Sequence, residues 1–306
     1  MSRFFSAVSL AVTALCVANQ AQAWCRTTTC DQLEPPPECG ITSPNLCSTQ
    51  GTKIAWPSTC VSTSVSANGS PLRNIAAEQM REVVRKAFEQ WTTVDCGNGT
   101  HPNFVVDMFP NVNCTAVTGD NGYKSTGPNY NVWIFRDTDW PYDSTDENAI
   151  AITTTQFSPD TGVIYDSDVE LNSRDQPFTA TNPPEDVGMD LASVVQHEAG
   201  HFLGLAHSQN PGATMFPSLG TSDISRRILS QDDIDGICDA YKPGTLDPNC
   251  DPEPRHGFST ECTLDKGCCT VAPGRANGAR NGRDSLMIAA FLAMAVVRRR
   301  GRQRSV

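Results

Sequence analysis

The chain has 306 residues, 39% of them hydrophobic, which is enough apolar content for one sizeable core. Its formal net charge of −11 conceals an asymmetry, because residues 24–270 hold 14 Lys and Arg against 33 Asp and Glu, whereas residues 271–306 are rich in Arg. The acidic body argues against nucleic acid and against anionic membrane surfaces as partners.

Residues 1–23 have the three parts of a secretory signal peptide. Arg3 supplies the positive charge, residues 4–17 form an apolar run, and Ala21-Gln22-Ala23 is a small-residue cleavage site. Export also explains the twelve cysteines other than Cys16, which are too many for a reducing cytosol. We therefore expect a secreted or surface-located protein with disulfide bonds.

Residues 24–52 form a cysteine-rich N-terminal segment without helical or strand periodicity. A Pro-rich stretch lies among its cysteines, and the sequence does not give their pairing. We expect disulfide bonds to hold this segment in a loop-like conformation.

Residues 53–243 show a sheet followed by helices. Alternating or β-branched runs predict strands at 61–65, 104–109, 131–135, 149–157 and 163–171. Apolar residues at helical spacing, opened by Ser70 and Pro71, predict a long amphipathic helix that ends near Trp91. Two further helices are expected at 189–203 and 232–241.

Residues 197–207 read HEAGHFLGLAH and hold three of the five histidines. His197 and His201 are four residues apart, so a helix places them on one face, where a single Zn²⁺ can bind both. His207 would point roughly 240° away if the helix continued. Gly204 can adopt the left-handed conformation that ends a helix, and the chain can then turn back.

The pattern predicts catalytic zinc rather than structural zinc. A structural site usually has four protein ligands, and no further Cys or His lies nearby in the sequence. Three ligands leave one position for water, and Glu198 stands beside them to act on that water.

This long motif resembles that of the metzincin metalloendopeptidases. Met215, in Ala213-Thr214-Met215-Phe216-Pro217, follows the third histidine at the position of their methionine turn. Ser208, directly after the third histidine, resembles the sequence of the matrixin branch at this point. The resemblance implies that His197, His201 and His207 bind zinc, that Glu198 is the general base and that Met215 lies under the metal. An ordinary core methionine is the alternative for Met215.

The resemblance also implies an α+β fold, with a twisted mixed sheet, a backing helix, an active-site helix and a C-terminal helix. It implies that residues 216–229 wall the substrate pocket and that the strand at 149–157 binds a peptide in extended form. Pro37-Glu38-Cys39-Gly40 faintly resembles the propeptide cysteine switch of matrixins, but it lacks their Arg and Pro-Asp. We expect Cys39 to be in a disulfide.

Asp166, Asp168 and Glu170 alternate along the predicted strand 163–171 and would project to one side of it, where they could share Ca²⁺. The matching matrixin segment carries structural zinc and calcium ligands, but this chain has Asp168 in place of a zinc-binding His. A polar strand edge that faces solvent is the alternative interpretation.

Two segments follow the predicted catalytic domain. Residues 244–270 form a Cys- and Pro-rich linker, and residues 271–306 form a tail with a short apolar helix at 286–297 and an Arg cluster. With Cys268-Cys269 before it, the tail resembles the myxobacterial C-terminal sorting tag (MYXO-CTERM), which implies surface location. A simple tail anchor is the alternative, although twelve apolar residues are short for a membrane span.

Taken together, the sequence predicts a secreted or surface-anchored zinc metalloendopeptidase. We expect a monomer with a protein or peptide substrate, which touches the membrane only through its tail. The alternative is a surface binding or adhesion module that keeps the scaffold and no longer cuts. Glu198 argues against this alternative, because a protein that does not cut has no need of the carboxylate.

Overall fold

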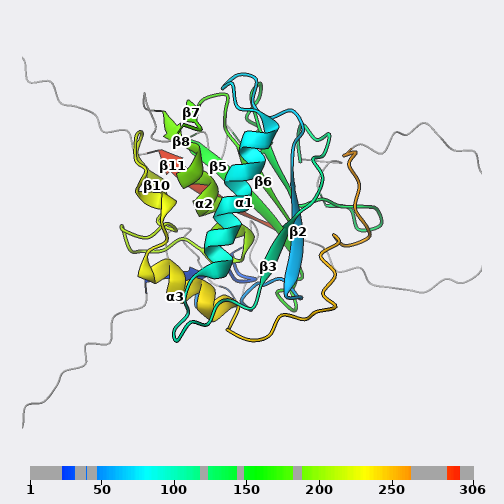
Figure 1. The fold of residues 1–306 in the computed structure, drawn as a ribbon, viewed down its shortest axis with the longest axis vertical. Helices are drawn as coiled ribbons and strands as arrows, with labels where there is room; N and C mark the ends of the chain where they lie inside the picture. Colours follow the sequence, from blue (N-terminus) through cyan, green and yellow to red (C-terminus); the bar gives the residue numbers. More distant parts are fainter. Residues whose placement is uncertain are drawn as a thin grey trace, which may run out of the picture.

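The computed structural model describes residues 23–31, 39, 47–117, 123–142, 148–181, 188–262 and 288–296. Its main feature is a seven-stranded mixed sheet in the order β10-β11-β5-β6-β4-β2-β3 (Figure 1). In chain order the strands are β2 (Cys60–Val65), β3 (Val105–Met108), β4 (Val132–Phe135), β5 (Ala149–Phe157), β6 (Ile164–Leu171), β10 (Ser218–Leu219) and β11 (Ile288–Val296).

Three α-helices accompany this sheet, namely α1 (Ala77–Thr93), α2 (Leu191–Phe202) and α3 (Gln231–Ala240). There are also two short strand pairs, of which the first joins distant parts of the chain. Strand β1 (Cys25–Arg26) pairs with β9 (Leu205–Ala206), and β7 (Phe178–Thr179) pairs with β8 (Met189–Asp190). The expected α+β fold, with its backing, active-site and C-terminal helices, is confirmed.

Strands β3, β2, β4 and β6 run parallel to one another, and β5 runs antiparallel to β6. Every residue of β2 and β4 is buried, as expected for strands inside a covered parallel sheet. All five predicted strands are present, with ends that differ from the prediction by one residue at most.

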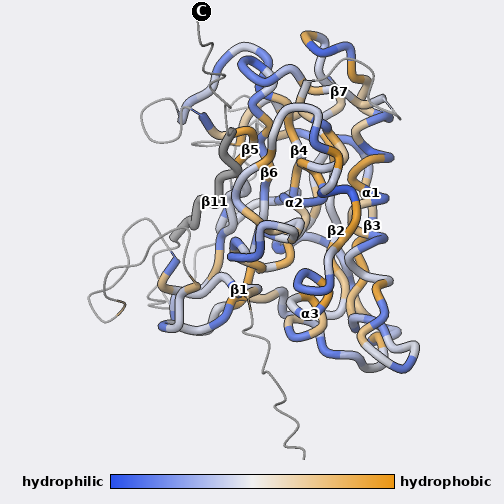
Figure 2. The backbone as a smooth tube through the Cα atoms, turned by 90° about the vertical axis from the view of Figure 1, so that its left-hand side faces the viewer, coloured by the Kyte–Doolittle hydropathy of each residue, from blue (hydrophilic) through white to orange (hydrophobic). Residues whose placement is uncertain are grey.

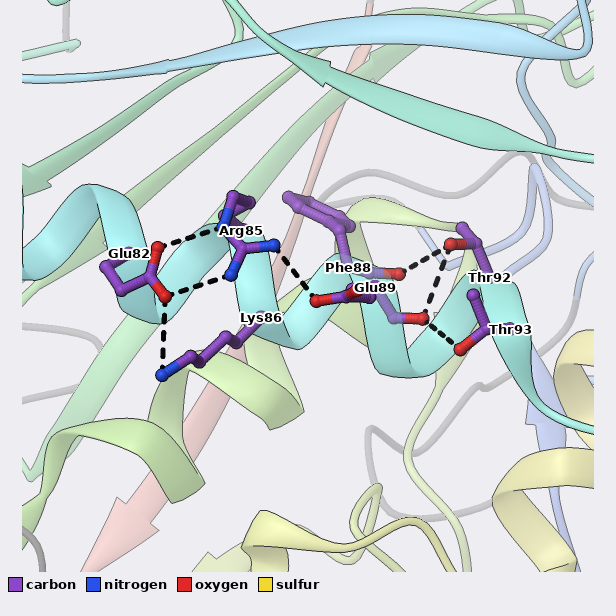
Figure 3. A network of polar contacts seen from close by, with 7 residues as sticks. All are labelled: Glu82, Arg85, Lys86, Phe88, Glu89, Thr92 and Thr93. Atoms are coloured by element: carbon purple, nitrogen blue, oxygen red, sulfur yellow. Dashed lines mark hydrogen bonds and ion pairs between the residues drawn. The ribbon is translucent and has the colours of Figure 1, made fainter.

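Helix α1 packs one face on the core and exposes the other. Its buried side chains are Met80, Val84, Ala87, Phe88 and Trp91. On the exposed face Glu82 and Glu89 flank Arg85, with Nη1 of Arg85 3.0 Å from Glu89 Oε2 (Figure 3). Such exposed ion pairs contribute only about 0.3–0.5 kcal/mol each, so the buried face determines where α1 lies.

The prediction that this helix opens at Ser70 and Pro71 is wrong. Ser70 instead pairs with Ile75 in an isolated bridge, and its hydroxyl donates to Asp137 at 2.7 Å. These tertiary contacts hold a turn in which Asn74 has φ 55°, and the helix begins only at Ala77.

Helices α1 and α2 meet in the centre of the core. The ring centroids of Phe88 and Phe202 lie 4.9 Å apart, and Nε1 of Trp91 donates to the carbonyl of Gln196 at 2.9 Å. Figure 2 shows hydrophobic stretches of β4 and α2 inside the molecule, whereas the outer turns of α1 are hydrophilic.

Five disulfide bonds lie in the part of the chain that the structure describes. Two of them, Cys25–Cys47 and Cys30–Cys39, hold the N-terminal segment, so Cys39 is paired as expected. Cys96–Cys238 ties the loop after α1 to α3. Cys60–Cys250 and Cys114–Cys262 fasten the expected linker, over residues 250–262, to the sheet domain.

The tail differs from the prediction. Residues Ile288–Val296 form strand β11, not an apolar helix, because the open edge of β5 offers them backbone partners. Within the described ranges no helix is both long and apolar enough to span a membrane. The predicted signal peptide up to residue 22, Cys268-Cys269 and the Arg cluster lie outside the described residues.

Candidate active site

Helix α2 carries the first two histidines, and its N-terminus is held firmly. Asp190 is the N-cap, and its carboxylate accepts from the Ser193 amide at 3.0 Å. The same carboxylate accepts from Arg227 at 2.7 Å, in an ion pair where Asp190 is 1% exposed. Eleven of the twelve α2 residues are buried, so the helix lies within the core between α1 and β5.

The three predicted ligands come together. One ligand atom from each of His197, His201 and His207 lies within 4.8 Å of the other two, and all three residues are buried. Nε2 of His197 and Nε2 of His201 are 3.0 Å apart. Within the described ranges this is the one group of three or more Cys, His, Asp or Glu residues that could hold a metal ion.

Backbone carbonyls fix the orientation of two of these rings. Nδ1 of His197 donates to the carbonyl of Thr214 at 2.7 Å, and Nδ1 of His201 donates to Leu205 at 2.8 Å. These contacts leave Nε2 of each ring as the lone-pair atom in the shared space. Burial, followed by the nearby histidines, lowers the pKa of His197 to about 3 and that of His201 well below its usual range. Both rings are thus neutral, as metal ligands must be.

Gly204 makes the turn that the spacing predicts. Its φ is +85°, and an added Cβ would meet the carbonyl oxygen of Ile54 at 2.8 Å. The chain then reverses into β9, whose partner β1 comes from the N-terminal segment. The amide of Thr27 donates to the carbonyl of Gly204 at 3.0 Å. The cysteine-rich segment therefore supports the turn that brings His207 back, a role that the sequence did not reveal.

Met215 lies directly against α2 and is 2% exposed. A Cβ on Gly200 would meet its Sδ at 2.2 Å, so a glycine between the two helical histidines makes room for this methionine. Met215 is thus a core residue packed against α2 at Gly200, and its role under the metal stays a prediction.

Asp233 also supports the site, in a role that the sequence did not reveal. Its carboxylate accepts from the amides of Thr214 at 2.7 Å and Met215 at 3.0 Å. It also accepts from the Ser230 amide at the start of α3. Because the Thr214 carbonyl accepts from His197, Asp233 fixes the loop that orients the first histidine.

Glu198 follows His197 on α2 and is fully buried. Its Oε2 accepts from the hydroxyl of Thr153 on β5 at 2.6 Å, whereas no residue that the structure describes forms a hydrogen bond with Oε1. Burial raises the pKa of this carboxyl to about 8, and the Thr153 contact opposes that rise. A buried carboxyl with one oxygen still available suits a group that exchanges protons.

The three proposed calcium ligands are buried, but Glu170 has different partners from Asp166 and Asp168. Asp166 and Asp168 contact each other, and burial raises the pKa of both, that of Asp166 to about 7. Glu170 is instead paired with Arg136 at 2.9 Å and hydrogen-bonded to Tyr142 at 2.5 Å. The three-carboxylate site is therefore not formed, and the alternative of a solvent-facing edge is also wrong, because all three residues are at most 3% exposed.

Strand β11 lies along the strand that was expected to bind a peptide. It pairs antiparallel with β5, with Leu292 opposite Thr153, and pairs parallel with β10 (Figure 1). Adjacent strands are about 4.8 Å apart, so the backbone of β11 passes close to the residue that contacts Glu198. An extended segment thus fits between β5 and β10.

Comparison with known proteins agrees with this geometry. Residues 134–242 match the matrixin family (Peptidase_M10). The chain is 49% identical to stromelysin-1 of Rattus norvegicus over 63 residues, which are 20% of this chain and 13% of that protein. It is 38% identical to neutrophil collagenase of Homo sapiens over 106 residues (31% and 21%) and 36% identical to matrilysin of Homo sapiens over 85 residues (28% and 30%).

The chain therefore spans less than a third of the length of these relatives. The matched region holds β5, β6, the three histidines, Met215 and α3. These findings support a metzincin-like metalloprotease with an α+β matrixin catalytic fold.

Proposed function

We propose that the chain is an exported zinc metalloendopeptidase in which Glu198 acts as the general base. The observation that carries the proposal is that three buried imidazoles meet in one place, with a buried carboxyl on the same helix that has one oxygen available. The donor set fits zinc, because imidazole nitrogens are preferred ligands and three of them leave a coordination position open.

The chain's own residues would act as follows. His197, His201 and His207 would hold the metal, and bound zinc would supply a Lewis acid that polarises the peptide carbonyl and acidifies water. Oε1 of Glu198 would take a proton from the attacking water and pass it to the leaving amine nitrogen. Burial of Glu198 in the core raises its affinity for that proton.

An extended peptide would bind along β5. Open strand edges bind peptides through backbone hydrogen bonds. The pairing of β11 with β5 and β10 supports this placement, because it shows a segment of this chain in an extended conformation beside Thr153. In this arrangement the tail occupies the position that a peptide substrate would need.

Export of the chain is supported by its disulfide bonds, which persist in oxidising compartments. The signal peptide over residues 1–23 and the surface-sorting tail over 271–306 remain predictions from the sequence. Calcium also remains a prediction, now limited to Asp166 and Asp168, because Arg136 holds Glu170.

The test compares the full chain with Glu198→Ala and His207→Ala, and with Glu89→Ala as a matched control on the exposed face of α1. We would measure zinc per chain and the cleavage of casein. We expect one zinc in all variants except His207→Ala, and cleavage only in the wild type and Glu89→Ala. Zinc binding without any cleavage would favour the binding-module alternative, and a folded chain that binds no zinc would refute the proposal.

A further inference from the structure

One hydroxyl joins the central sheet to the catalytic carboxyl. Oγ1 of Thr153 donates to Oε2 of Glu198 at 2.6 Å, and both side chains are fully buried. Among the described residues this is the only hydrogen bond to the Glu198 carboxyl, since Oε1 has none. The two oxygens of Glu198 are therefore in different environments.

This asymmetry restricts the rotation of the carboxyl. A carboxyl group on a three-bond side chain can rotate, and one donor to Oε2 selects a rotation in which Oε1 stays without a hydrogen-bond partner. Positioning of this kind matters because a misplacement of about 1 Å can reduce the rate about 100-fold.

The backbone at Thr153 is well suited to hold a donor in place. The residue lies in the middle of the nine-residue strand β5, paired with Val169 of β6 on one side and with Leu292 of β11 on the other. Threonine is β-branched, so few side-chain rotamers are open to it. The hydroxyl therefore has little freedom to leave Glu198.

We propose that Thr153 is a positioning residue that holds Glu198 with Oε1 directed at the attacking water. This inference rests on the proposed function, in which Glu198 accepts a proton. The competing explanation is that the hydroxyl only satisfies a buried carboxyl and stabilises the fold. The two explanations differ in what they predict for catalysis when the fold is intact.

The strand offers a matched control. Thr155 is also fully buried, and its hydroxyl lies 3.0 Å from Ser167 Oγ. Thr153→Val and Thr155→Val thus remove the same group from the same strand, but only the first removes a contact to Glu198. Thr153→Ser keeps the hydroxyl and tests whether that group alone restores activity.

The kinetic experiment uses the zinc-loaded full chain and a fluorogenic peptide. For Thr153→Val we expect kcat to fall about 10- to 100-fold, with KM within about twofold of the wild type. Thr153→Ser and Thr155→Val should keep kcat within about threefold of the wild type. An unchanged kcat in Thr153→Val, or a Thr153→Ser variant as slow as Thr153→Val, would overturn the inference.

A second readout needs neither metal nor activity. Urea unfolding of the metal-free chain is compared for Thr153→Val in the wild type and in the Glu198→Ala background. We expect the midpoint shift caused by Thr153→Val to become much smaller without Glu198, and equal shifts would overturn the inference. A wild-type chain that binds zinc and cleaves nothing would refute the proposed function, and the catalytic role of Thr153 with it, whatever the urea experiment shows.

Discussion

Gly200→Ala tests whether the methionine turn is tightly packed under the active-site helix. Alanine is favoured over glycine inside a helix by about 1 kcal/mol, so helix propensity alone predicts a more stable chain. The structure predicts the opposite. The new Cβ would lie 2.2 Å from Sδ of Met215 and 3.0 Å from a ring carbon of Trp91, and all three residues are buried.

The size of the effect follows from these two terms. Overpacking a dense core costs about 1–3 kcal/mol, because buried side chains must leave their preferred rotamers. The Asp233 carboxylate holds the backbone amide of Met215 at 3.0 Å, so the new Cβ must be accommodated by the Met215 side chain, which is itself buried. After the gain in helix propensity is subtracted, we expect Gly200→Ala to lower the free energy of unfolding by up to about 2 kcal/mol.

Gly236→Ala is the matched control in α3. There an added Cβ would approach Cβ of Trp24 at 3.4 Å, an ordinary contact, so the variant should be neutral or more stable by up to about 1 kcal/mol. Urea unfolding of the metal-free chain measures both variants, and zinc titration of the folded chain follows. Two equal effects, or a Gly200→Ala chain that is more stable than the wild type, would refute the close packing of Met215 on α2.

Three further predictions concern stability and the tail. Burial raises the pKa of Asp166 from 3.8 to about 7, so the folded chain loses stability as pH rises between these two values. Without calcium, Asp166→Asn should therefore be more stable than the wild type at pH 8, by at most about 4 kcal/mol. At pH 3, where Asp166 is protonated in both states, the two chains should be equally stable. Asp190→Ala should lower the free energy of unfolding by about 2–4 kcal/mol, because α2 loses its N-cap and Arg227 loses its ion-pair partner. Asp190→Asn should lower the free energy of unfolding by less, and equal losses in the two variants would contradict the role of the charge. The double variant Phe291→Pro and Leu292→Pro lacks the backbone N–H groups of two consecutive residues in β11, one of which faces β5. If β11 is paired in nine chains out of ten, this variant should have a kcat/KM about tenfold above that of the wild type. An unchanged kcat/KM would show that the tail does not compete with substrate.

The sequence predicted those parts of the site that depend on local spacing. His197 and His201 share a face of the helix because four residues make about one turn. The chain reverses after the helix with a positive φ, which glycine adopts readily, and Gly204 stands at that position. The alternation of Asp166 and Asp168 on one strand face was also correct. These relations hold within a few residues and need no knowledge of the fold.

Contacts between distant residues could not be predicted in the same way. Residues 153, 154 and 155 are all threonine, so the sequence does not distinguish them. It is the packing of β5 against α2 that makes Thr153 the partner of Glu198. Arg136 lies 34 residues before Glu170, and nothing in either segment indicates that an ion pair would remove this carboxylate from a calcium site. The N-terminal boundary of α1 was wrong for a similar reason, since Asp137 holds the turn at Ser70.

The proposed zinc ligands are held in place by parts of the chain far from the motif. His197 is oriented by the Thr214 carbonyl, whose loop Asp233 fixes from α3. His207 follows a turn whose Gly204 carbonyl accepts from Thr27 of the N-terminal segment. Each of these supports is buried and satisfies a backbone group, so its loss would leave an unpaired polar atom as well as a displaced ligand. The N-terminal segment and α3 therefore support the proposed metal centre, and removal of either should weaken zinc binding although neither supplies a ligand.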